Sequence, residues 1–214
     1  TLAVMAILMS ILLPSLSGVR ETARQVICRS NVRQMGIGLT QFAGAHNDKL
    51  PYSGMQAAGK PFDTMILRSG ITGEWDGLGL LFSEEFMPAP LIFYCPSHHG
   101  MHPFVAYEEE WAHGTGDIIG NFQYRYKGPM STAPGSQKTE FLSLMHPGVT
   151  LIVDGVRSMS DFNHLVGANV FRADSSVAWF CSSGSPVQSQ ISSNPSVVPT
   201  SGEMEQIWIG LDRR

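Results

Sequence analysis

Residues 1–36 read TLAVMAILMSILLPSLSGVRETARQVICRSNVRQMG, and their pattern decides the fold. The first thirteen carry no charge, whereas arginines follow Pro14 at positions 20, 24, 29 and 33. As an α-helix, residues 1–13 would rise about 20 Å, less than the roughly 30 Å hydrocarbon core of a bilayer. No basic residue precedes this run and residues 14–17 make a poor cleavage site, so a secretory signal peptide is disfavoured.

After Pro14 the sequence shows separate apolar and polar positions at helical spacing. Apolar residues recur at three- and four-residue steps, at Val19, Ala23, Val26 and Ile27, while Glu21 and Gln25 join the arginines on another face. This spacing predicts an amphipathic helix that ends near Asn47-Asp48. We therefore expect one helix over residues 1–46, kinked at Pro14, apolar over 1–16 and amphipathic over 17–46. An apolar half without a partner in its own domain must contact lipid or other copies of the chain.

The composition narrows the class of protein. The 214 residues suffice for one ordinary domain and an appendage. The net charge is −4, which argues against a nucleic-acid partner, and charged residues make up only 15%, below the roughly 25% of typical soluble domains. Three cysteines allow at most one disulfide within the chain.

Residues 47–214 predict a β-rich head domain. Strands are expected at 91–95, 121–126 (half-buried) and 149–155, with a hairpin of 168–173 and 176–180 around Asp174-Ser175. Residues 62–82 predict a short helix or two, residues 97–117 a polar loop, and residues 182–202 a Ser/Pro-rich arm. The last ten residues return to order around Ile207, Trp208 and Leu211. The fold class is α+β, a long helix packed on a small antiparallel sheet.

Five landmarks carry a resemblance to a known family. AVMAILMSILLP (3–14) is similar to the interior of a prepilin-type N-terminal segment, and CRSNVRQMGIGLTQFAGAHNDKLP (28–51), FYCPSHH (93–99), HLVGANVFRADSSVAWF (164–180) and the terminal IWIGLDRR follow in order. The chain resembles the type IV pilin-like, type II secretion pseudopilin-like proteins of planctomycete-type bacteria. Their signature is a histidine, nine residues and Asp-Gly; His164 and Asp174 fit, and Ser175 stands in place of the glycine. Aligned on Pro14, the family's glutamate near the helix start falls before Thr1.

The resemblance implies a pilin-like fold and a structural role as subunit of a helical filament at the cell surface or in the periplasm. It implies identical subunits as partners, the inner membrane as the location before assembly, and a pilus or secretion assembly machinery. The filament core would be formed by Leu2, Val4, Ile7, Leu8, Ile11, Leu12, Pro14, Leu16 and Val19. If one disulfide forms, the family positions favour Cys28 with Cys95, which would tie the helix to the sheet domain and leave Cys181 as the odd thiol.

Two groups of residues have side chains that could bind a metal ion. Cys95 with His98, His99 and His102 has the residue types that zinc prefers, but the spacing is irregular, so a histidine-rich surface loop is favoured and no metal is expected. The acidic run 108–110 with Asp117 lacks EF-hand spacing and more often marks a solvated face. Calcium remains a lesser alternative, which the resemblance to secretion pseudopilins allows.

Catalysis is not expected. His164 and Asp174 have the residue types of an acid–base dyad. No G-x-S-x-G, H-E-x-x-H or phosphate-loop motif accompanies them, so a catalytic role is disfavoured. We interpret them as structural, with Asp174 in a hairpin turn that His164 could hydrogen-bond. Two rival hypotheses to the filament subunit stay open: a monomeric, membrane-anchored binding module that uses loop 97–117, and a metal-dependent hydrolase centred on Cys95 and the histidines.

Overall fold

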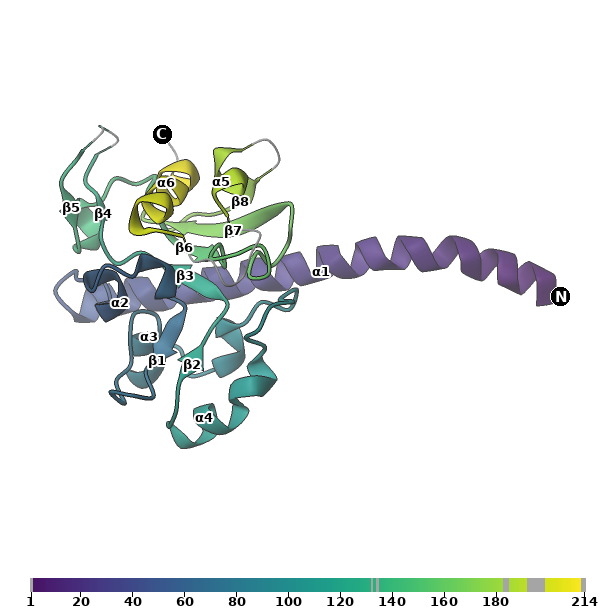
Figure 1. Cartoon of the computed structure of the whole chain (residues 1–214), viewed down its shortest axis with the longest axis horizontal. Coiled ribbons are helices and arrows are strands. Elements are labelled where there is room, and N and C mark those ends of the chain that lie inside the picture. The colour runs from purple at the N-terminus through teal and green to yellow at the C-terminus, as the bar shows by residue number, and fades with distance from the viewer. Residues whose placement is uncertain (1, 132, 134, 183–184, 192–198, 213–214) are drawn as a thin grey trace.

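The computed structural model describes residues 2–131, 133, 135–182, 185–191 and 199–212, with side chains described from Gly18 onward except that of Pro186. Its longest element is α1 (Leu2–Ala45), which passes Pro14 as a continuous helix. Figure 1 shows α1 curving gently and extending well beyond the head domain at its N-terminal end. Within the described residues, no helix combines the length and the apolar character needed to cross a membrane.

The C-terminal part of α1 packs against the head through one stripe of residues. Cys28, Val32, Met35 and Leu39 are completely buried, and Phe42 is nearly so. These positions are three or four residues apart, which places them on one face of an α-helix. The helix ends where Asn47 and Asp48 adopt left-handed backbone angles, with φ of 53° and 68°.

The head is built on one antiparallel sheet. Its strands are β3 (Phe122–Tyr124), β6 (Thr150–Asp154), β7 (Gly167–Arg172) and β8 (Val177–Cys181), in the order β3-β6-β7-β8. Every residue of β6 and β7 is buried. This means that the sheet is covered on both faces, as Figure 1 also shows.

One face of the sheet packs against α1 and the other against two C-terminal helices. Ile152 and Phe171 join the α1 stripe in one apolar cluster. Val153 and Val170 join a second cluster with α5 (Pro186–Gln190) and α6 (Ser201–Leu211). Helix α6 begins at a capping box between Thr200 and Glu203.

A buried arginine fixes the end of α6. The Arg125 side chain is 1% exposed; its Nη1 lies 3.0 Å from Asp212 Oδ2, and its Nη2 lies 3.2 Å from Glu205 Oε1. The guanidinium also lies over the Trp208 ring, 5.6 Å from its centroid. Because a buried charge is costly unless paired, these contacts determine where α6 sits on the sheet.

Small elements complete the head beside this sheet. The short helices are α2 (Gly54–Ala57), α3 (Gly79–Ser83) and α4 (Glu108–His113). The 3₁₀ helices are η1 (Pro61–Asp63), η2 (Pro90–Phe93), η3 (Phe104–Tyr107) and η4 (Leu142–Leu144). Two further strand pairs join β1 (Ile66–Arg68) to β2 (Ile118–Ile119) and β4 (Gly128–Pro129) to β5 (Lys138–Thr139).

The α+β fold class is confirmed, as are the long helix, the buried strand within 149–155, the hairpin around Asp174-Ser175 and the ordered C-terminus. Four local predictions were wrong. Residues 91–95 hold the end of η2, because Pro90 favours the first turn of a helix. Residues 122–124 are fully buried, and loop 97–117 contains η3 and α4. The arm 182–202 contains α5 and the start of α6, and its residues 192–198 lie outside the described residues.

The closest approach of α1 to the sheet yields a test. A Cβ at Gly36 would overlap the Phe171 ring, whereas a Cβ at Gly44, also in α1, would meet nothing within 4 Å. Gly36→Ala should lower the free energy of unfolding by about 1–3 kcal/mol through overpacking. Gly44→Ala should raise it by about 0.5–1 kcal/mol through helix propensity alone. Urea unfolding of both variants measures this, and a stabilising Gly36→Ala would contradict the packing described here.

Candidate functional site

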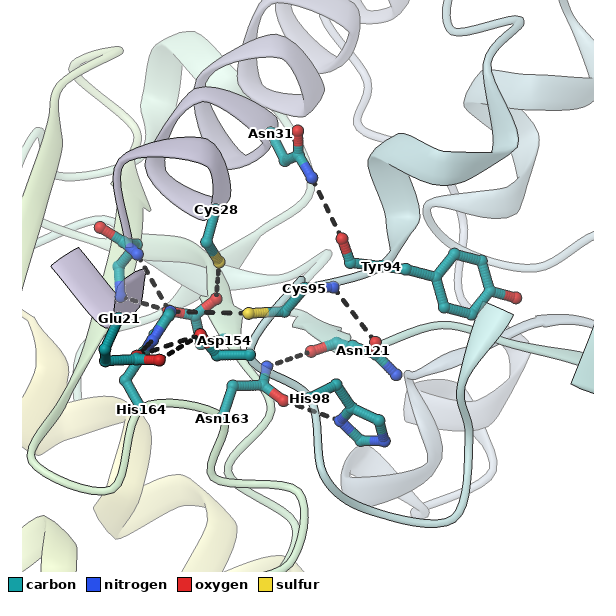
Figure 2. Close-up of polar contacts among 12 residues, drawn as sticks. Glu21, Cys28, Asn31, Tyr94, Cys95, His98, Asn121, Asp154, Asn163 and His164 are labelled. Atoms are coloured by element: carbon teal, nitrogen blue, oxygen red, sulfur yellow. Dashed lines mark hydrogen bonds and ion pairs between the residues drawn. The ribbon is translucent and has the colours of Figure 1, made fainter. Parts of the chain in front are cut away.

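Four elements bring four reactive side chains together where α1 enters the head. Cys28 lies on α1, Cys95 follows η2, Asp154 ends β6, and His164 precedes β7. We call these four residues the junction cluster. Their relative exposures are 0%, 4%, 0% and 4%, and one sulfur, nitrogen or oxygen atom from each lies within 4.8 Å of the others. Figure 2 shows the four side chains converging on one point.

Local packing explains this convergence. Cys28 is the first completely buried residue of the α1 stripe, so it meets the sheet at the edge of the apolar interface. Asn121, beside the start of β3, holds two loops: its Oδ1 accepts from the Cys95 backbone N–H at 3.1 Å, and its backbone carbonyl accepts from Asn163 Nδ2 at 3.3 Å. The loops that carry Cys95 and His164 are therefore tied to the same strand.

Two hydrogen bonds and one ion-pair contact connect the members of the junction cluster. Cys28 Sγ donates to Asp154 Oδ1 at 2.7 Å, and Cys95 Sγ lies 3.5 Å from His164 Nε2. His164 Nε2 also lies 3.6 Å from Asp154 Oδ2. The same Oδ2 accepts from the backbone N–H of Asn169 at 2.6 Å, so Asp154 is held from β7 as well.

A carboxylate from α1 completes the surroundings of the imidazole. Glu21 Oε1 lies 2.8 Å from His164 Nδ1, and the Glu21 carboxylate also accepts from Ser97 Oγ. Glu21 is the only acidic residue between positions 1 and 45. It therefore lies on the side of α1 that faces the head, together with Cys28, and not with the exposed arginines as the sequence pattern predicted.

Burial and neighbouring charges shift the pKa values of the four cluster residues in different directions. Burial raises the pKa of Asp154 and that of the Cys28 thiol. Burial opposes ionisation of Cys95 too, but hydrogen bonds with Cys28 and His164 outweigh it and lower the Cys95 pKa. Burial likewise opposes a charged His164, yet Cys95, Asp154 and Glu21 raise its pKa to about 9. A negative charge on Cys95 and a positive charge on His164 therefore favour each other.

The three histidines weighed with Cys95 for metal binding lie outside the junction cluster. Among the described residues, the group able to hold a metal ion is the junction cluster, which includes Cys95 but none of His98, His99 and His102. His98 Nδ1 is 2.7 Å from Asn163 Oδ1, and His99 Nδ1 is 3.3 Å from the Ser97 carbonyl oxygen. His102 contacts the Tyr107 hydroxyl. Each histidine therefore has its own partner.

The acidic run weighed for calcium is likewise dispersed. Glu108, Glu109 and Glu110 form the first turn of α4, where negative charge suits the helix dipole. Asp117 accepts from the Gly70 backbone N–H at 2.6 Å. Neither belongs to the group of described side chains that could hold a metal ion.

The cysteines are free thiols in the structure, with Cys28 and Cys95 buried and Cys181 exposed. The Sγ atoms of Cys28 and Cys95 are within 4.8 Å of each other, so the disulfide between them stays a prediction that the fold permits by proximity. Sequence reasoning missed Asp154 and Glu21 altogether. A carboxylate ending a buried strand, and a lone acid on an arginine-rich helix, were the signals available.

The two signature residues lie at opposite ends of β7. Asp174 lies in the turn to β8, where its Oδ1 accepts from the Ser176 backbone N–H at 3.0 Å. His164 belongs to the junction cluster instead, so the interpretation of His164 as a partner of that turn is corrected. Ser175 has a φ of 63°, the left-handed region in which glycine is least strained.

Comparisons with known proteins give one match. A family model described as "Protein of unknown function (DUF1559)" matches residues 17–85. No curated protein and no solved structure matches the chain. The similarity covers the helix residues Glu21 and Cys28 but stops before Cys95, Asp154 and His164.

The turn at Ser175 offers a test of the signature. Ser175→Gly should raise the free energy of unfolding by about 0.5–1 kcal/mol, because it relieves a left-handed residue that carries a Cβ. Ala173→Gly, two residues away where φ is not positive, should lower it by a similar amount. Thermal unfolding of the two variants distinguishes them; equal effects would mean that backbone strain at Ser175 is absent.

Proposed function

We propose that this protein is the structural subunit of a helical filament of the type IV pilus or pseudopilus kind. The observation that carries the proposal is the length of α1 outside the head. Glu21 still contacts the head through His164, so residues 2–20 extend beyond that contact over roughly 30 Å of helix. A helix of this length, without cover from its own domain, requires a partner for its apolar side chains.

The exposed part of α1 presents a stripe that suits another helix. Val19 and Val26 are 63% and 64% exposed, and Gly18, Thr22 and Ala23 line the same surface. The sequence pattern placed this apolar stripe on one face, and it points away from the head. Toward the N-terminus, the uncharged residues 1–13 follow this stripe in the sequence. The structure describes side chains only from Gly18 onward, so it does not describe those of the predicted core residues up to Leu16.

The occupant we propose for this stripe is the same helix of a neighbouring copy. Small residues such as Gly18 and Ala23 allow close approach of two helices, and each large apolar side chain buried contributes about 1.5–3 kcal/mol. A contact between unlike surfaces of identical subunits repeats without closing and produces an open filament. Before assembly, we propose that the helix resides in the inner membrane and that a pilus or secretion machinery extracts it.

Two further points support the proposal. The match to the DUF1559 family model begins at residue 17 and includes the whole exposed stripe and the α1 residues that dock on the sheet. The five landmarks that resemble pseudopilin-like proteins are spread along the chain in the expected order. The folded head, with its two covered sheet faces, would then coat the outside of the filament.

A charge in the stripe should abolish assembly. We expect that Val19→Asp, or the pair Ile7→Asp and Ile11→Asp, reduces filaments counted by electron microscopy at least tenfold in cells producing the full-length protein, because a carboxylate cannot be buried between apolar helices.

The matched control is Ile71→Asp on the head, where Ile71 is 96% exposed, and it should leave filament numbers unchanged. Protein level and thermal unfolding of the head should be the same in all variants. Filaments at wild-type abundance in the Ile7→Asp, Ile11→Asp variant would refute the proposal. Wild-type protein that remains monomeric in the membrane would favour the anchored binding module instead.

A further inference from the structure

We propose that Cys28, Cys95, Asp154 and His164 bind one Zn²⁺ ion, which fastens α1 to the head. Two thiolates, an imidazole and a carboxylate are donors that zinc accepts, and four protein ligands without an open position are the pattern of a structural zinc site. The junction cluster supplies this set within 4.8 Å, from side chains that are all buried. The inference does not depend on the filament role, because it rests on the fold of a single chain.

Two of the three separations between donor atoms suit a tetrahedral ion. Zinc bond lengths of roughly 2.0–2.3 Å place neighbouring ligand atoms about 3.3–3.8 Å apart. Cys95 Sγ and His164 Nε2 are 3.5 Å apart, and His164 Nε2 and Asp154 Oδ2 are 3.6 Å apart. Cys28 Sγ and Asp154 Oδ1 are closer, at 2.7 Å, since a thiol hydrogen bond joins them. Loss of that proton and rotation of one side chain would open this edge by about 1 Å.

The atoms around the cluster are arranged as they commonly are around a metal centre. Histidine ligands of zinc commonly direct their second ring nitrogen to a carboxylate, and His164 Nδ1 meets Glu21 at 2.8 Å. Ligating carboxylates are themselves held by hydrogen bonds, and Asp154 Oδ2 accepts from Asn169. The Glu21 contact leaves His164 Nε2 free to face the other donors. In Figure 2 this nitrogen and the sulfurs of Cys28 and Cys95 lie around a common point.

The buried acidic groups of the cluster are a further reason to propose a bound cation. Asp154 and Cys28 are completely buried, and an ionised group in such a place is costly without an opposite charge. On binding, the cysteine thiols and the His164 imidazolium would release their protons, so a dication would meet three negative charges. Cys95 also lines a surface groove with Asn31, Tyr94 and Phe104, so the cluster adjoins this groove through Cys95.

The consequence for the fold is a cross-link between distant segments. Positions 28, 95, 154 and 164 come from the helix, two loops and the end of a central strand. A metal ion bound to all four would hold the helix at the point where it leaves the head. Binding to the folded chain alone would stabilise it in proportion to the logarithm of the zinc concentration.

The experiment uses the full chain, purified under reducing conditions without chelator and analysed for metal by mass spectrometry. We expect about one zinc per chain, and replacement by Co²⁺ should give the thiolate charge-transfer and intense visible absorption of tetrahedral cobalt. Cys95→Ser and His164→Gln should each weaken zinc binding at least about 100-fold, because each removes a ligand. Glu21→Gln should weaken it about tenfold, since it removes only an orienting carboxylate.

Matched controls are Cys181→Ser and His98→Gln, which change a thiol and an imidazole outside the cluster and should retain one zinc per chain. If the ligand variants fail to fold, the cobalt spectrum of the wild-type chain and the partly exposed Glu21→Gln variant still decide. Reduced wild-type protein that takes up neither Zn²⁺ nor Co²⁺ would overturn the proposal. So would a Cys28–Cys95 disulfide in metal-free protein isolated from cells, because zinc needs both thiolates.

Discussion

The packing of one helical stripe, Cys28 to Phe42, onto the central sheet is the interaction on which the rest of the structure depends. It requires Gly36, because α1 comes so close to Phe171 that no side chain fits between them. It also divides α1 into a docked part and a projecting part. The sheet has only one remaining face to cover, and α5 and α6 cover it. Both faces of the sheet are therefore covered by elements of the same chain, whereas the projecting part of α1 is not covered by the head.

The junction cluster lies where this apolar interface ends. At Cys28 the stripe changes from apolar to polar, and Glu21 and Gln25 continue it toward the N-terminus with Glu21 meeting His164. A polar cluster at this place gives the helix a defined direction as it leaves the head, because hydrogen bonds are directional whereas apolar contacts are not.

Prediction from the sequence succeeded where hydrophobic pattern and turn chemistry agreed. The buried run that contains β6 and the hairpin of β7 and β8 are examples, and so is the return to order at α6. It failed at residues 91–95, because a short apolar run next to prolines does not distinguish a strand from a helical turn. It also failed for β3, whose alternation suggested one exposed face, because Gln123 and Arg125 are buried by neighbours distant in sequence.

The sequence by itself determined the long helix and its apolar stripe, which follow from periodicity within one segment, and the α+β class, which follows from the order of the elements. That the head leaves this stripe exposed was decided by the tertiary structure, because Glu21 and Cys28 turn the opposite side of α1 toward the head. Only the tertiary structure decided that Cys28, Cys95, Asp154 and His164 form one site. Their spacing follows no local pattern, and each is placed by a different element packed on the sheet. Three histidines lie near Cys95 in the sequence, whereas the histidine that meets Cys95 in the structure, His164, lies sixty-nine residues away.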